Sequence, residues 1–231
     1  MKTIGMLEGM SWESTVSYYQ AVNRGIKDKL KGLHSAKICL FSVDFDEIEK
    51  LQHSSRWNEA ATLLGAAAKS VEAGGADFLV ICTNTMHKVA DDIEESISIP
   101  ILHIADATAE VLIGDGIKKV GLLGTRFTME EDFYKSRLIN KFGIEVIVPD
   151  EEQRDLIHRV IYDELCVGNI RPDSRHSYLN IIQDLYSKGA EAVILGCTEI
   201  GLLVSRSDTD IPLYDTTAIH AEKAVKMALE N

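Results

Sequence analysis

Eight short apolar runs recur along the chain, and stretches with helical periodicity separate them. The runs are rich in Val, Ile and Leu, and they read KTIGML, AKICLFSV, DFLVIC, IPILHI, KVGLLG, IEVIVP, EAVILGC and IPLYDT. Two of the intervening stretches, 57–75 and 174–190, repeat their apolar residues at helical spacing. Short apolar runs that alternate with helices are typical of a parallel sheet covered on both faces. We therefore predict an α/β protein with doubly wound parallel sheets.

Part of this pattern occurs twice. Three segments recur in the same order, at offsets of 116, 114 and 112 residues: TIGMLEG with KVGLLGT, GADFLVICTNT with GAEAVILGCTE, and IPILHIADAT with IPLYDTTAIH. Buried strands can have similar sequences by chance, because all are rich in Val, Ile and Leu. The shared order of the segments, the Gly-Ala that begins a repeated segment and the polar residues that end it favour internal duplication instead. The sequence predicts two pseudo-symmetric α/β lobes, the first over 1–110 with a C-terminal return over 211–231, and the second over 111–210.

Composition narrows the class of protein. The chain has 231 residues, 45% of them hydrophobic and only 4 of them proline, which allows a real core. The net charge of −12 disfavours nucleic acid as a partner, because a protein needs a basic surface to bind the phosphates. No stretch approaches the roughly 18 apolar residues that span a membrane. The N-terminal MKTIGMLEGM lacks the apolar region of a secretory signal, which favours a cytoplasmic protein.

The spacing of the residues indicates neither a metal site nor a dinucleotide-binding site. The four cysteines are far apart and form no CxxC motif, so we expect neither a zinc site nor a disulfide framework. The histidines lack the spacing of metal ligands, and we assign no metal. Glycines are too sparse for a dinucleotide-binding fingerprint, so no NAD is expected.

Small polar residues end two matching strands of the predicted lobes. Thr83 follows DFLVIC, and Cys197 takes the corresponding place after the second copy of that strand. Ligands of parallel α/β sheets bind outside the carboxyl ends of the strands. If the lobes face each other, the two ends lie on opposite sides of one cleft. A proton-transfer group on each side suits a reaction at a stereocentre, where one group removes the α-proton and the other supplies a proton.

The motifs resemble those of one family. Two segments resemble the two cysteine motifs of the aspartate/glutamate racemase superfamily: TNTMH over 83–87 and GCTE over 196–199. Four segments resemble its L-aspartate/glutamate-specific or broad-specificity branch: GMSWEST, LHIADAT, ELCVGN and GCTEIGLL. The resemblance covers the whole chain. It implies an amino-acid racemase that works without pyridoxal phosphate or any other cofactor. A small amino acid is the implied substrate, and a homodimer is an expectation carried over from the family.

The first motif departs from the family at its catalytic position. Thr83 stands where the family has its first cysteine, and Cys82 lies one residue earlier. Alternation along a strand turns Cys82 away from Thr83 and into the core. A threonine hydroxyl is a poor base, whereas a thiol titrates at about 8.5 and hydrogen-bond donors or a helix N-terminus can lower that value. We expect Cys197 to be the competent base, with Thr83 a weak proton relay, and the resemblance implies that the enzyme acts on L-amino acids.

Other polar residues beside these strand ends are candidates for substrate binding. Removal of an α-proton builds negative charge on the adjacent carboxylate, and hydrogen-bond donors stabilise that charge. The resemblance assigns Asn84, Thr85 and Thr198 to the carboxylate and amine of the substrate. Glu199 fits an amine-binding role, and Met10 is a candidate backbone donor. The alternative for Asn84, Thr85 and Thr198 is that they only cap the following helices.

Recognition of the substrate's side chain is less sharply defined. Aspartate-specific relatives use an arginine and a lysine, but the segment SVDFDEIEKLQ has no arginine, and Cys166 takes the lysine's place. Gln52 and Glu164 are the candidates in these neighbourhoods, and they suit a broader pocket that accepts neutral amino acids. Their alternative reading is as helix-surface residues. Cationic side chains remain available at three other positions: His53, Arg56 and Arg126.

Two further residues, Glu8 and His87, each have two possible roles. Glu8 stands where relatives usually have glycine, and it either repels acidic substrates or points to solvent. His87 lies four residues after Thr83, and it either polarises the site or is a satisfied histidine at a helix start.

Two functions other than racemisation are also compatible with these motifs. Single-cysteine relatives in the superfamily include decarboxylases that protonate one face of an enolate. A non-catalytic amino-acid-binding protein that has lost one base is the other alternative. TNTMH together with GCTEI favours the racemase.

Overall fold

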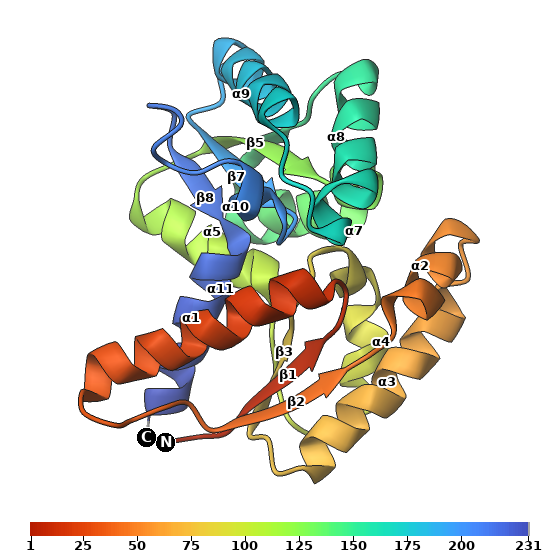
Figure 1. Cartoon of the computed structure of the whole chain (residues 1–231), viewed down its shortest axis with the longest axis vertical. Coiled ribbons are helices and arrows are strands. Elements are labelled where there is room, and N and C mark those ends of the chain that lie inside the picture. Colours follow the sequence, from red (N-terminus) through yellow and green to blue (C-terminus); the bar gives the residue numbers. More distant parts are fainter. Residues whose placement is uncertain (231) are drawn as a thin grey trace. The chain divides into compact units, whose positions relative to one another are not determined.

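The computed structural model describes residues 1–230, which form two compact units (Figure 1). The first unit contains Met1–Ile104 and the C-terminal segment that begins at His220. The second contains Ala105–Ile219. The chain therefore passes from one unit to the other twice, after Ile104 and after Ile219.

The first unit contains one four-stranded parallel sheet in the order β2-β1-β3-β4. Its strands are β1 (Ile4–Glu8), β2 (Ile38–Ser42), β3 (Phe78–Ile81) and β4 (Ile101–Leu102). Its helices are α1 (Trp12–Leu30), α2 (Phe45–His53), α3 (Trp57–Ala73), the 3-10 helix η1 (Thr85–Val89), α4 (Ala90–Glu94) and most of α11 (Thr216–Leu229).

Side-chain alternation gives this sheet two buried faces. Met6 and Val80 belong to a core shared with α1 and α11, while Leu7 and Ile81 belong to a second core shared with α2, α3 and α4. Consecutive strand residues point to opposite faces, so a strand covered on both sides has to be apolar throughout. The continuous apolar runs in the sequence reflect this arrangement.

The second unit repeats the topology with its own parallel sheet, in the order β6-β5-β7-β8. Its strands are β5 (Lys119–Gly124), β6 (Glu145–Ile147), β7 (Ala192–Gly196) and β8 (Leu213–Asp215). Its helices are α5 (Ile104–Gly114), α6 (Arg126–Glu130), α7 (Asp132–Ser136), the π-helix η2 (Arg137–Lys141), α8 (Glu151–Asp163), the 3-10 helix η3 (Leu165–Val167), α9 (Pro172–Ser187) and α10 (Ile200–Leu203). All eight predicted strands are present, and the predicted α/β fold class is confirmed.

Repeated contacts support the duplication seen in the sequence. The Leu79 N–H donates to the Pro100 carbonyl at 2.9 Å, and the Val193 N–H donates to the Pro212 carbonyl at 2.9 Å. These residues are related by the sequence offsets of 114 and 112. Hydrogen bonds between matching residues of the two sheets are expected if one ancestral unit was copied.

Gly5 and Gly121 are a second matched pair. A Cβ atom added to Gly5 would lie 2.6 Å from Val71 Cγ1, and one added to Gly121 would lie 2.8 Å from Leu185 Cδ1. Val71 and Leu185 are themselves 114 residues apart. In both units, the helix before the third strand packs so closely on the first strand that no side chain fits there.

The boundaries of the two units differ from those expected for the lobes. Residues 105–110 and 211–219 were expected in the first lobe, but they belong to the second unit. The physical reason for the later segment is that β8 pairs in parallel with β7, with Tyr214 opposite Ile194. The return to the first unit begins only within α11.

Within residues 1–230, no helix is long and apolar enough to cross a membrane.

Candidate active site

The first candidate motif follows β3 directly. Thr83, Asn84 and Thr85 come after the last strand residues, and all three are buried. The Cys82 N–H still donates to the Leu7 carbonyl at 3.0 Å, so β1 and β3 end together. The motif therefore lies at the carboxyl end of this sheet, where ligands of parallel sheets bind.

Two predicted binding residues lie close to this motif. Gln52, near the end of α2, is buried, and its amide nitrogen donates to Met86 Sδ at 2.9 Å. Met10 belongs to the apolar core that also contains Met86. The structure thus brings the β1–α1 turn and α2 to the first motif, and the surface alternative for Gln52 is wrong.

Cys82 is buried in the core, as strand alternation predicts. Only 1% of its surface is exposed, and it packs in the core between the sheet, α1 and α11. Burial, followed by the neighbouring Glu8 carboxylate, raises the pKa of the Cys82 thiol well above its usual value. Cys82 is therefore poorly suited to act as a base in place of Thr83.

Glu8 does not point to solvent, so that alternative is wrong. It ends β1, is 1% exposed, and interacts with the thiol of Cys82, which directly follows β3. Leu7 lies opposite Ile81 in the parallel register, which places Glu8 beside Cys82 at the strand ends. The sequence showed an unusual carboxylate at this position, but only the strand pairing identifies its neighbour.

The second candidate motif follows β7, and it holds a buried thiol against a carboxylate. The Cys197 thiol donates to Glu199 Oε2 at 3.0 Å, and the Thr198 hydroxyl donates to the same oxygen at 2.8 Å. All three residues are buried. The structure therefore assembles Cys197, Thr198 and Glu199 into one hydrogen-bonded group.

The environment of Cys197 does not lower the pKa of its thiol, as hydrogen-bond donors or a helix N-terminus can do. Burial, followed by the Glu199 carboxylate, raises the pKa of the thiol well above its usual value. Both effects disfavour the thiolate, because the anion is removed from water and meets a second negative charge.

Further polar groups of the second unit surround Cys197. Tyr178 in α9 is buried, and its hydroxyl donates to the Ile157 carbonyl at 3.0 Å. Burial raises the pKa of Tyr178 well above its usual value, and Cys197, Glu164 and Cys166 raise it further. Cys166 also contributes to the raised pKa of Cys197. Tyr178 lies in an ordinary helical pattern, which contains no signal that would have identified it.

Glu164 is held by hydrogen bonding at the end of α8. Its Oε2 accepts from the Ser174 hydroxyl at 2.5 Å, and Arg171 lies 3.6 Å from its Oε1. The side chain is only 17% exposed, which argues against a helix-surface role. Glu164 therefore belongs to the group of residues around Tyr178.

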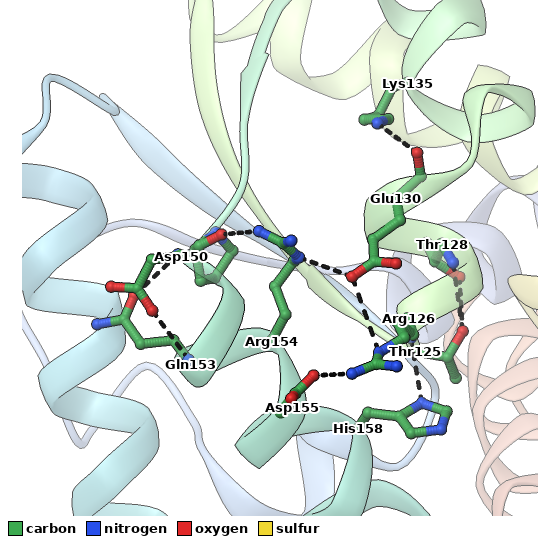
Figure 2. Close-up of polar contacts among 11 residues, drawn as sticks. Thr125, Arg126, Thr128, Glu130, Lys135, Asp150, Gln153, Arg154, Asp155 and His158 are labelled. Atoms are coloured by element: carbon green, nitrogen blue, oxygen red, sulfur yellow. Dashed lines mark hydrogen bonds and ion pairs between the residues drawn. The ribbon is translucent and has the colours of Figure 1, made fainter.

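The three cationic candidates are each engaged by acidic residues. His53 lies 2.9 Å from Glu49, Arg56 pairs with Glu59 at 2.5 Å, and Arg126 pairs with Asp155. Figure 2 shows the Arg126 guanidinium between Asp155 and Glu130 on the surface of the second unit, with Arg154 on the far side of Glu130. Each of these three side chains therefore already has an acidic partner within its own unit.

The four cysteines, all of which lie within residues 1–230, form no disulfide. Among the 230 described residues, no three side chains of the metal-binding types His, Cys, Asp and Glu are grouped to hold a metal ion.

The predicted site residues are divided between the two units. The first unit contains Met10, Gln52, Thr83, Asn84 and Thr85, and the second contains Glu164, Cys197, Thr198 and Glu199.

Comparison with known proteins gives consistent matches. The sequence profile described as Asp/Glu/Hydantoin racemase matches residues 7–224. The broad specificity amino-acid racemase RacX of Bacillus subtilis is 27% identical over 190 residues, which are 81% of this chain and 75% of RacX.

Two crystal structures resemble the whole chain. A protein from Yersinia pestis, provisionally described as an Asp/Glu racemase, is 54% identical with a TM-score of 0.92. PH1733, an aspartate racemase homologue from Pyrococcus horikoshii, is 34% identical with a TM-score of 0.85. Both matches cover 100% of each chain.

Proposed function

The chain belongs to the Asp/Glu/hydantoin racemase family, and on that premise we propose that it is a cofactor-independent amino-acid racemase in which Cys197 removes the Cα proton. The substrates are L-aspartate, L-glutamate or a broader set of L-amino acids, and reprotonation from the Thr83 side is weak. The family and its relatives support the coarser assignment, an isomerase that racemises amino acids.

The hydrogen bond between Cys197 and Glu199 is the observation that carries the proposal. The thiol proton moves to Glu199, which leaves a thiolate and a neutral carboxylic acid. The thiolate then takes the Cα proton, and the electron pair of the C–H bond moves into the substrate carboxylate. A thiol with a raised pKa gives a strong base once it is ionised, which suits a weakly acidic C–H bond.

Reprotonation on the other side is the weaker step. Thr83 offers a hydroxyl group, which is far less acidic than a thiol, so it acts as a slow relay that gives its proton to Cα and takes one from solvent, while Glu199 returns its proton to solvent. Asn84, Thr85 and Thr198 carry hydrogen-bonding groups at the strand ends, and these suit the carboxylate and amine of the substrate. Gln52, Glu164 and Met10 complete the set of proposed binding residues, with Glu199 near the amine.

Hydrogen exchange at Cα tests this function directly. The protein is incubated in deuterated water, without added cofactor, with separate L- and D-forms of glutamate, aspartate and neutral amino acids. Proton NMR follows the Cα signal. We expect loss of the signal from L-substrates and much slower loss from D-substrates. If no amino acid of either hand exchanges, the racemase proposal is rejected in favour of a decarboxylase or an amino-acid-binding protein.

Replacing Thr83 with cysteine tests the role of the first motif. Thr83→Cys places a thiol at the end of β3, and we expect exchange of D-substrates to rise by about 10²-fold or more, the usual contribution of a positioned acid or base. The increase is measured by the same NMR assay. Cys82→Ala is the matched control, and it should leave exchange unchanged because Cys82 is buried in the core. Loss of activity in Cys82→Ala together with no effect of Thr83→Cys would place the functional residue at 82.

A further inference from the structure

His87 uses both of its ring nitrogens within the first unit. Nδ1 lies 2.8 Å from the Thr83 carbonyl oxygen, and Nε2 accepts the Ile104 N–H at 3.2 Å. Thr83 is the residue at the end of β3, and Ile104 begins α5. The ring is buried, with 4% of the residue exposed.

These two bonds fix the tautomer of the ring. Because Nε2 accepts the Ile104 N–H, it carries no proton, and Nδ1 must then carry the proton that it donates to the Thr83 carbonyl. The imidazole is therefore neutral and engaged on both sides. Adding a proton would break the bond to Ile104, so His87 is not a proton carrier for the substrate. Of its two expected roles, the satisfied histidine is the one the structure supports.

The bond to Thr83 also sets the orientation of the next amide group. The Thr83 carbonyl and the Asn84 N–H belong to the same peptide unit, and in a planar trans peptide they point in opposite directions. Holding the carbonyl toward His87 therefore turns the Asn84 N–H away from His87. This peptide joins the residue at the proposed proton relay to the first residue proposed to bind the substrate carboxylate.

Neighbouring rings hold His87 in place. The His103 ring centroid lies 4.4 Å from that of His87, and the His220 centroid lies 6.0 Å away. His220 is itself fixed, because the Tyr18 hydroxyl lies 2.9 Å from its Nδ1 and its Nε2 lies 2.7 Å from the Leu102 carbonyl oxygen. A ring packed among such neighbours has little freedom to rotate, so its Nδ1–H stays directed at Thr83.

We propose that His87 is a positioning residue, which directs the peptide between Thr83 and Asn84 so that the Asn84 N–H meets the substrate carboxylate. This inference rests on the proposed racemase function. During proton removal, negative charge grows on that carboxylate, and an amide that is already oriented stabilises it without reorganisation. His87 acts only through the backbone and does not touch the substrate.

A pair of amide substitutions separates this role from a purely structural one. Asparagine has its amide nitrogen at the same number of bonds from Cβ as Nδ1, so His87→Asn keeps a donor for the Thr83 carbonyl. Glutamine has its amide nitrogen at the place of Nε2, so His87→Gln loses that donor. Both variants lose the imidazole ring and its packing against His103. Each is measured by Cα exchange of an L-substrate and by chemical denaturation.

We expect kcat/KM for exchange to fall about tenfold or more in His87→Gln, because the Asn84 N–H is no longer held toward the developing charge, and to stay within about threefold of wild type in His87→Asn. Equal activities in the two variants, or activities that follow their loss of stability, would overturn the positioning role while leaving the racemase function intact. Absence of exchange in the wild-type protein would instead remove the proposed function, and this inference with it.

Discussion

Cys197→Ala is expected to abolish exchange of the Cα hydrogen of L-amino acids. A general base typically contributes about 10²–10⁴-fold to a reaction, and the remaining members of this group, Thr198 and Glu199, offer no thiol in its place. The loss should appear as a retained Cα signal in deuterated water at enzyme concentrations that exchange the signal fully for the wild-type protein.

Cys39→Ala is the matched control for this variant. Cys39 lies in β2 of the first unit and is a free, half-buried thiol. We expect its loss to leave exchange at the wild-type rate. Exchange that survives in Cys197→Ala, with wild-type circular dichroism, would show that another group removes the α-proton and would contradict the proposed mechanism.

His220 is expected to make the protein lose stability as the pH falls from about 6.5 to about 4. Burial lowers the pKa of His220 from 6.5 to about 4, and the hydrogen bond to the Leu102 carbonyl offsets part of that effect. Between these values the unfolded chain binds a proton that the folded protein does not, so the free energy of unfolding falls with decreasing pH. The full effect is about 3 kcal/mol, at 1.36 kcal/mol for each pH unit between the two pKa values.

The measurement is urea denaturation of wild type and His220→Gln between pH 4 and pH 7. Glutamine keeps an amide donor at the place of Nε2 and cannot be protonated in this range, so the stability advantage of the wild-type protein should shrink by about 3 kcal/mol toward pH 4. His34→Gln removes an exposed histidine and should run parallel to wild type. Parallel profiles for wild type and His220→Gln would show that His220 is not buried in its neutral form.

Local pattern was sufficient to predict the elements of the fold. Each of the eight apolar runs contains a strand, because a strand buried on both faces must be apolar along its whole length. Alternation also placed Cys82 in the core. The repeat predicted two similar units, and the matched contacts of Gly5 and Gly121 support it. The assignment of 211–219 differs because strand pairing, which sequence does not display, keeps β8 in the second sheet.

The sequence identified the candidate residues of the site, but not the charges and hydrogen bonds around them. Glu199 lies only two residues after Cys197, but the sequence does not show that its carboxylate meets the thiol, so it did not reveal that burial and Glu199 raise the pKa of Cys197. The sequence also did not reveal the acidic partners of Arg56 and Arg126, although each partner lies within 30 residues of its arginine along the chain. The partner of a charged side chain depends on rotamers and packing, which periodicity does not encode.

The sequence by itself determined the fold class, the duplication, and the two motifs that close β3 and β7, because these depend on patterns within a few residues. Only the tertiary structure decided what those motifs touch: Glu8 beside Cys82, Glu199 on Cys197, and His87 between Thr83 and Ile104. Protonation is set by burial and by neighbouring charges and hydrogen bonds, and these depend on how side chains pack in three dimensions, even for Cys197 and Glu199, which are only two residues apart in the chain.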